Sequence, residues 1–337
     1  MNAFDKMNAF NKANPEAKEV YRKMQQWQVL NKPENGVFCP MYEVVRFSPS
    51  VYQEYCMVGT NNLADLRYST HKYMSDLHVF GAWRNSLGIY VIDKDIIQDI
   101  VKSPIPVETP VDIFSRLPEW CVYMDMSALN YMETVKEGVA LKIIGFWALY
   151  DLVFLNEKYQ RILKLYVNIE GGNSDNLAPI IEMAIDNGKT VEQSINDAYK
   201  AEKDIDPIVA LNYAKSDIDM LKMLLSMLLW LCAEEPDISN IQGEPVNKDA
   251  LRLPKYRVNK KTGVFIPPDK PTIYDIGKRL GGEIRTFNER LGSGDSRISS
   301  RKRPHIRRGH WHGVWSGTGQ NKEFKIYWQP AIFVNTS

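Results

Sequence analysis

The sequence has 337 residues, of which 44% are hydrophobic and 25% are charged, so it is typical of a folded globular protein and not of a disordered or fibrous one. Its net charge of +1 conceals an uneven distribution: residues 251–337 hold 18 Lys and Arg against 6 Asp and Glu, which leaves 24 against 35 for residues 1–250. An acidic body and a basic last quarter predict either attraction between the two or an anionic partner such as nucleic acid.

Secretion, membrane insertion and zinc binding are all disfavoured. The four cysteines lie far apart, without a CxxC pair or a secretory signal, which indicates a reduced, cytosolic protein. The longest apolar run, at 224–232, is too short to span a bilayer. A zinc site can be drawn from four side chains, but their spacing matches no standard finger and we expect no metal there: Cys39, Cys56, His71 and His78.

The first half of the chain is predicted to be a helix followed by a sheet. Val20, Met24 and Trp27 recur at spacings of three and four, which predicts an amphipathic helix over residues 15–30. Residues 37–170 are predicted to consist mostly of strands with turns. The segments richest in β-branched and aromatic residues are 87–92, 120–126, 141–155 and 161–169, the last two joined as a hairpin through 156–160.

The second half is predicted to be mostly helical. After residue 171, helices are expected over residues 190–201 and 216–232, the second opening with a capping box. Residues 236–272 are rich in Pro, Lys and Asn, which predicts an extended surface connection. A basic amphipathic helix is expected over residues 275–291.

Strands followed by helices favour an α+β fold, with a mixed or antiparallel sheet packed with helices and a basic C-terminal helix and β-hairpin. Three parts are expected along the chain: an N-terminal helical arm at 1–36, an acidic α+β body at 37–250 and a basic C-terminal segment at 251–337. We expect the basic segment to pack on the body as one unit, because their charges are opposite.

A cluster of basic and aromatic residues lies near the C-terminus. Residues 301–316 contain three of the five histidines, two of the eight tryptophans and five Lys and Arg, and residues 296–322 contain no Asp or Glu. Segments 310–316 and 323–329 are predicted to form a hairpin, and alternation along its arms separates an apolar face from a cationic strip. The apolar face contains Trp311, Trp315, Phe324, Ile326 and Trp328, and the strip contains Arg301, Lys302, Arg303, Arg307, Arg308, His310, His312 and Lys325.

Four interpretations of this strip remain open. His305, His310 and His312 could bind a metal, although no carboxylate is near in sequence and the neighbouring cations would repel it. One of these histidines could act as a general acid or base in RNA cleavage. A non-catalytic surface for RNA, an acidic peptide or the protein's own acidic body needs only the charges and rings present, and is favoured. Finally, these side chains could simply tie the hairpin to the body by hydrogen bonds.

The motifs of common enzyme classes are missing from the sequence. It contains no Walker-type GxxxxGK[ST], no GxGxxG after a strand, no GxSxG and no HExxH. We therefore expect no cofactor and no small-molecule substrate, and favour a binding protein over an enzyme.

Several segments resemble one known family. The run 303–312, followed by Trp315, Ser316 and Gly317 and by residues 328–335, is similar to the C-terminal signature of the second family of type V-A anti-CRISPR proteins, which occur on phages and mobile elements of bacteria. Three further segments resemble this family in the same order, so the resemblance covers roughly residues 85–335: 117–123, 228–234 and 276–281.

This resemblance implies an inhibitor of the type V-A CRISPR effector, an RNA-guided DNA nuclease, in the cytoplasm of a bacterial host. It implies recognition of the effector's nascent polypeptide during translation, with the ribosome or messenger RNA as further partners, and loss of the effector's messenger RNA and protein. An open sheet edge in the body could hold an extended peptide while the basic strip contacts RNA phosphates. The alternatives are an RNA-directed hydrolase that uses the C-terminal histidines and an inhibitor that occupies the mature effector.

Overall fold

The computed structural model divides the chain into two compact units, each built from three stretches of sequence. The first unit contains Met1–Ile89, Glu119–Asn187 and Leu253–Thr272, and the second contains Tyr90–Pro118, Gly188–Arg252 and Ile273–Ser337. These boundaries differ from those of the predicted arm, body and basic segment. The residues that the structure describes are 2–32, 36–58, 66–134, 140–155, 158–170, 177–186, 188–205, 215–247, 257–262, 264–292 and 305–334.

Eight strands form one mixed sheet, which confirms the predicted fold class. They are β1 (Gly88–Ile92), β2 (Cys121–Asp125), β3 (Tyr131–Thr134), β4 (Ala140–Leu155), β5 (Lys158–Glu170), β6 (Ala178–Ala184), β7 (Ile238–Asn240) and β10 (Thr272–Ile276). The strand order is β6-β5-β4-β2-β1-β10-β7, with β3 paired to β4. The long β4 and β5 are antiparallel from Lys142 opposite Glu170 to Leu155 opposite Lys158.

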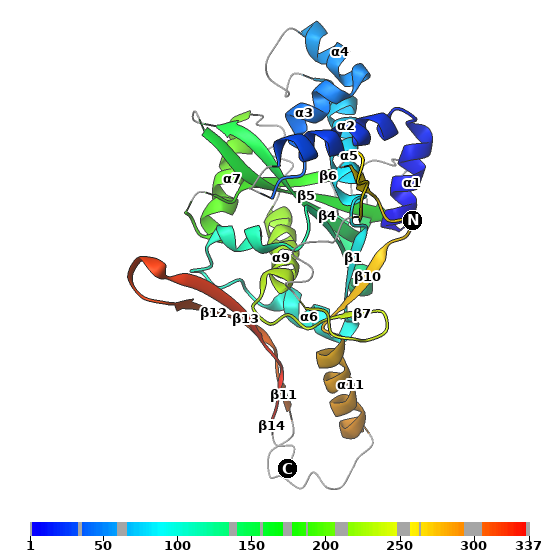
Figure 1. Cartoon of the computed structure of the whole chain (residues 1–337). Coiled ribbons are helices and arrows are strands. Elements are labelled where there is room, and N and C mark those ends of the chain that lie inside the picture. The colour runs from blue at the N-terminus through cyan, green and yellow to red at the C-terminus, as the bar shows by residue number, and fades with distance from the viewer. Residues whose placement is uncertain are drawn as a thin grey trace. The chain divides into compact units, whose positions relative to one another are not determined.

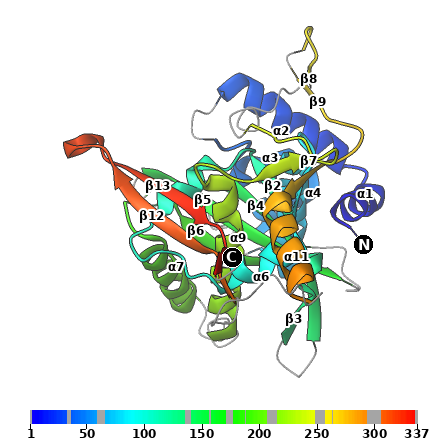
Figure 2. The same cartoon turned by 90° about the horizontal axis from the view of Figure 1, so that it is seen from below.

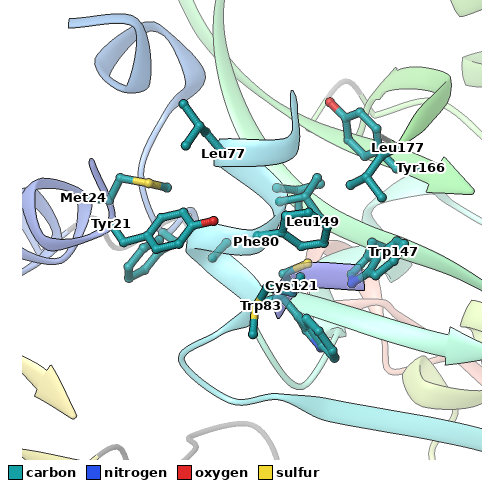
Figure 3. Close-up of a cluster of buried hydrophobic side chains, with 14 of the residues drawn as sticks. Tyr21, Met24, Leu77, Phe80, Trp83, Cys121, Trp147, Leu149, Tyr166 and Leu177 are labelled. Carbon is teal, nitrogen blue, oxygen red and sulfur yellow. The ribbon is translucent and has the colours of Figure 1, made fainter. Parts of the chain in front are cut away.

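The first unit combines part of this sheet with N-terminal helices, coloured blue to cyan in Figure 1. Its other elements are α1 (Ala3–Ala13), α2 (Ala17–Asn31), α3 (Met41–Phe47), α4 (Pro49–Val58), α5 (Tyr68–Trp83), the 3-10 turn η3 (Ser127–Leu129), β8 (Arg257–Val258) and β9 (Phe265–Ile266). The apolar sides of α1, α2 and α5 pack on β2, β4 and β5 in one aromatic-rich core (Figure 3). At its centre the ring of Trp147 meets those of Phe80 and Trp83 edge-on, at centroid distances of 5.7 and 5.9 Å.

The first unit also buries a group of charged side chains. Lys164 in β5 is 5% exposed, and its Nζ lies 2.9 Å from Asp151 Oδ2 and 2.7 Å from Glu182 Oε1. Burial works against the ionised form of Asp151, but the nearby Lys164 and His78 outweigh it and lower the pKa of this carboxyl. His78 donates from Nε2 to the Cys39 carbonyl oxygen at 2.8 Å, and burial lowers the pKa of its imidazole. Lys164 and Asp151 can stay ionised in this buried position because each lies beside a group of opposite charge.

The second unit contains the remaining helices and the C-terminal strands. They are α6 (Lys94–Lys102), the 3-10 helix η2 (Val111–Arg116), α7 (Val191–Ile205), α9 (Lys215–Cys232), α11 (Lys278–Gly292), β11 (His305–Arg307), β12 (His310–Ser316), the 3-10 turn η5 (Gly319–Asn321), β13 (Glu323–Gln329) and β14 (Ile332–Val334). Strand β11 pairs with β14 and β12 with β13, both antiparallel. None of the helices among the described residues has the length and apolar character needed to cross a bilayer.

Most predicted elements are confirmed, within a few residues at their ends. The helix expected over 15–30 is α2, and those expected over 190–201 and 216–232 are α7 and α9. The four predicted strands are β1, β2, β4 and β5. Local composition is therefore enough to predict the order of these helices and strands along the chain.

Three predictions of secondary structure are wrong. Helices α3, α4 and α5 occupy 41–47, 49–58 and 68–83, where strands were expected. The helical period of α5 was missed because its second half is buried almost all round and so lacks the polar stripe that marks a surface helix. The segment after residue 171 contains strand β6 before the helices begin. Asp275 and Ile276 end strand β10, and Gly277, with a φ of 70°, separates it from α11.

Candidate functional site

The predicted C-terminal hairpin is present with its predicted arms, β12 and β13, which lie side by side in Figures 1 and 2. Trp311 pairs with Trp328, Gly313 with Ile326, and Trp315 with Phe324. Paired residues of antiparallel strands share a face, so the predicted separation of the two faces is confirmed. One face is aromatic and the other carries His310 and His312 beside Tyr327 and Lys325.

The aromatic face packs on α9 near the base of the hairpin. Trp311 is 5% exposed, and its ring lies edge-on to Trp230 at a centroid distance of 6.0 Å and to Trp328 at 4.9 Å. Its Nε1 donates to Ser226 Oγ at 2.8 Å, and Ser226 Oγ in turn donates to the Ile100 carbonyl oxygen of α6 at 2.9 Å. The serine that interrupts the apolar run of α9 is therefore the polar anchor for the hairpin.

The backbone of Gly309, which directly precedes β12, forms hydrogen bonds to Asp99 in α6 and to Ser103, the residue after α6. Its N–H donates to Asp99 Oδ2 at 3.3 Å, and its carbonyl accepts from Ser103 Oγ at 3.0 Å. An added Cβ at this position would lie 2.5 Å from the ring of Trp328. Because that ring is packed against Trp230 and Trp311, it cannot move aside without disturbing these contacts. Glycine is required here for close approach.

The outer edge of β13 is held by two further residues of the second unit. The Glu234 N–H donates to the Ile326 carbonyl oxygen at 2.9 Å, and Arg116 Nη2 donates to the Phe324 carbonyl oxygen at 2.7 Å. Arg116 also forms ion pairs with Glu234 at 2.7 Å and with Glu323 at 3.0 Å. Sequence reasoning missed Arg116, Ser226, Ser103 and Asp99 as anchors, since nothing local links them to the hairpin.

The opposite face of the hairpin base is open and cationic. Arg307, Arg308, His310 and His312 are exposed, and Lys325 is half-buried. Buried and exposed positions alternate here, because Gly309 and Trp311 are buried between these side chains. The structure therefore brings together five of the eight predicted strip residues. Arg301, Lys302 and Arg303 lie outside the described residues, and His305 lies in β11 opposite Val334.

One residue of the apolar face is not covered by the fold. Trp315 shares the face of Trp311, yet it is 53% exposed and touches only its cross-strand partner Phe324 among the rings of the described residues, at a centroid distance of 5.3 Å. Alternation along a strand shows on which face a residue lies, but not whether another element covers that face at its position. Trp328, the third predicted aromatic residue, is half-buried and its ring lies 5.4 Å from that of Trp230 and 4.9 Å from that of Trp311.

The predicted basic helix behaves differently from the strip. In α11, Arg285 Nη1 lies 2.9 Å from Asp93 Oδ1 and also pairs with Asp95. Arg279 pairs with Glu283 at 2.8 Å. For Arg307 and Arg308, by contrast, the described residues provide no ion-pair partner. The positive charge available to a ligand is therefore on the hairpin rather than on α11.

No group of three His, Cys, Asp or Glu within the described ranges is arranged to hold a metal ion. His310 and His312 are separated by one residue on an exposed strand. The hairpin of this α+β fold thus combines a largely buried aromatic face, an exposed cationic face and an exposed tryptophan.

Comparison with known proteins identifies the family. Residues 90–336 match the family model described as AcrVA2-like, anti-CRISPR type V subtype A2 family. The crystal structure of AcrVA2 is 38% identical and similar over 98% of this chain and 98% of that chain, with a TM-score of 0.78. A comparison with curated proteins gives no match. The chain belongs to the anti-CRISPR type V subtype A2 family, which implies that its target is a type V-A effector.

Family membership confirms the resemblance found in the sequence, including its extent from about residue 85. The structural similarity extends further, since it covers 98% of the chain and so includes the N-terminal helices that resembled nothing in sequence.

Proposed function

We propose that the protein suppresses the type V-A CRISPR effector by recognising its nascent polypeptide during translation in the cytoplasm of a bacterial host, which leads to loss of the effector's messenger RNA and protein. In this proposal the chain is an adaptor with two surfaces and not a nuclease itself. One surface reads an extended polypeptide and the other contacts ribosomal or messenger RNA.

The observation that carries the RNA part is the exposed cationic face of the hairpin. Arg307 and Arg308 have no carboxylate partner among the described residues, and His310, His312 and Lys325 extend the same face. Such side chains bind phosphates without reading sequence, and Tyr327 adds a ring beside them. The opposite face is packed on α9 through Trp311, so the backbone that carries these side chains needs little further ordering on binding.

The first experiment measures effector protein and messenger RNA in cells that co-express this protein with a type V-A effector gene. Three effector genes are compared: the native gene, a synonymously recoded gene and a frameshifted gene. Loss of message for the first two but not for the third is expected, because only those two encode the same polypeptide. Unchanged levels in all three would refute the proposal, and a loss of activity at constant effector level would indicate an inhibitor that occupies the mature protein.

The second experiment reverses charge on the hairpin. Arg307→Glu with Arg308→Glu, and separately Arg303→Glu, should abolish loss of the message while binding of the effector polypeptide is kept. The matched control is Lys260→Glu with Lys261→Glu, since these are also adjacent exposed cations but lie outside the hairpin. Equal loss of polypeptide binding and message loss would show that the two functions share one surface.

Alanine at His305, His310 or His312 separates an adaptor from a nuclease. A nuclease that uses one of these histidines loses all turnover when it is replaced, whereas a binding surface loses only a small part of its affinity. We expect each single variant to keep most of the message loss.

A further inference from the structure

The strands of this protein differ in how their outer edges are closed. The outer edge of β7 is covered by its own returning chain, because the Asn240 N–H donates to the Glu244 carbonyl and the Val246 N–H donates to the Ile238 carbonyl, both at 2.9 Å. Strand β6 contains Pro179, which has no N–H to offer. The outer edge of β13 is held by Glu234 and Arg116.

Strand β12 is the exception among the longer edge strands of the described chain. The carbonyls of Phe324 and Ile326 accept hydrogen bonds from Arg116 and from the Glu234 N–H, which shows that they point away from β12. Their partners Trp315 and Gly313 must therefore turn their own N–H and C=O groups away from β13, as in every non-hydrogen-bonded pair. Within the described residues no hydrogen bond uses these four backbone groups.

The sequence of β12 does nothing to block a further strand. Proteins protect exposed edges with proline, lysine, bulges or very short strands. The seven residues of β12 contain no proline, no lysine and no carboxylate, and they pair with β13 without a break in register. An open edge of this length normally carries a risk of aggregation unless a partner covers it.

An aromatic surface flanks the same edge. Trp315 is 53% exposed, and its ring lies edge-on to Phe324. Phe324 covers the position of the missing side chain at Gly313, where an added Cβ would lie 2.3 Å from its ring. A strand placed beside β12 could therefore pack an apolar side chain on the exposed ring of Trp315 and pair with the outward N–H and C=O groups of Gly313 and Trp315.

We propose that the open edge of β12 binds an extended segment of polypeptide as a third strand of the hairpin sheet, with an apolar side chain of that segment packed on Trp315. The inference rests on the proposed function and names the site that reads the effector polypeptide. It places that site on the edge of the hairpin and leaves the cationic face free for RNA.

The occupant is a polypeptide because of the spacing of the groups to be paired. Peptide groups of an adjacent strand match the N–H and C=O groups of Gly313 and Trp315 in both direction and repeat, and such strand addition is a common mode of peptide recognition. Nucleic acid would instead use the charged side chains of the outward face.

The site is tested by residue-resolved amide hydrogen exchange on the full chain, with overlapping synthetic peptides that together cover a type V-A effector polypeptide. A bound peptide should slow exchange at the amides of Gly313 and Trp315 by about 10-fold or more, since each gains a hydrogen bond. The amides of His312 and Val314 already bond to β13 and should not change. Protection elsewhere with none at Gly313 and Trp315 would overturn the assignment.

Two variants at one position isolate the backbone contribution. Trp315→Ala removes the ring, whereas Trp315→Pro removes both the ring and the outward N–H, so the proline variant should bind the peptide about 10-fold more weakly than the alanine variant. Tyr68→Ala removes an aromatic residue that is 76% exposed in the first unit and should leave affinity unchanged. Equal affinity of the proline and alanine variants would rule out strand addition at this edge.

Failure of this site and failure of the proposed function give different results. If Trp315→Pro still lowers the effector message as the unaltered protein does, the polypeptide is read elsewhere and the proposed function stands. If the unaltered protein binds no effector peptide and leaves effector levels constant, both proposals are wrong. Binding of an RNA oligonucleotide with protection of the same two amides, and of no peptide, would assign the edge to RNA.

Discussion

Two groups of charged residues, one in each unit, differ in burial and in pairing. In the first unit Lys164 and Asp151 are 5% and 1% exposed and are held between His78 and Glu182. In the hairpin of the second unit Arg307, Arg308, His310 and His312 are exposed, while the glycine and tryptophan between them are buried. A charge that is buried and paired specifies a fold, whereas a charge that the fold pushes into solvent without a partner is available to a ligand.

The largest expected effect contrasts two tryptophans of one strand. Trp311→Ala should lower the free energy of unfolding by about 3–5 kcal/mol, since it empties a site between Trp230 and Trp328 and leaves Ser226 without its donor. Trp315→Ala should change it by less than about 1 kcal/mol, because the ring is half exposed. Urea unfolding of both variants checks this contrast, which fails if the two losses are alike.

Breaking the buried ion pair of the first unit should have the next largest effect. Asp151→Asn should reduce stability by about 3 kcal/mol, at the lower end for a broken buried pair because Glu182 remains beside Lys164. The control is Glu170→Gln in the exposed pair with Lys142, where a loss of at most about 1 kcal/mol is expected. Similar losses in the two variants would mean that the buried pair has no special role.

Gly309→Ala tests whether contact with the Trp328 ring is the reason that a glycine precedes β12. The new methyl group would overlap the ring of Trp328, so we expect a loss of about 1–3 kcal/mol from overpacking. Gly319→Ala is a poor control because its φ is positive, whereas Gly282→Ala adds a methyl group in a helix where only Arg285 is near and should be neutral or stabilising. A neutral Gly309→Ala would show that the ring can move.

The smallest expected effect depends on pH. The pKa of His78 is lowered in the folded state by burial, so protonation favours the unfolded chain, and stability should fall as pH drops below about 6.5. The slope from this one group is at most about 1.4 kcal/mol per pH unit. His78→Gln keeps a donor for the Cys39 carbonyl but cannot titrate, so its unfolding free energy should vary less between pH 7 and pH 5; an unchanged slope would exclude His78 as its source.

Sequence reasoning was most successful where structure is local. The arms of the hairpin and the alternation of His310 and His312 with Trp311 follow from a period of two along the chain, and strands β4 and β5 follow from their content of β-branched and aromatic residues. It failed at α5, where burial on all sides hides the helical period, and alternation could not show that Trp315 is half exposed. Contacts such as Arg116 with the Phe324 carbonyl join residues far apart in sequence, and no local pattern signals them.

The interleaving of the two units has a consequence for biosynthesis. Each unit is built from three separated stretches, so the first unit lacks residues 253–272 and the second lacks residues 273–337 until the ribosome has made those last stretches. Domains that are continuous in sequence can fold one after another as they emerge, but here neither unit has all its residues before the other is well advanced. The hairpin therefore forms long after Asp99, Ser103 and Ser226, the residues that hold it, have been made.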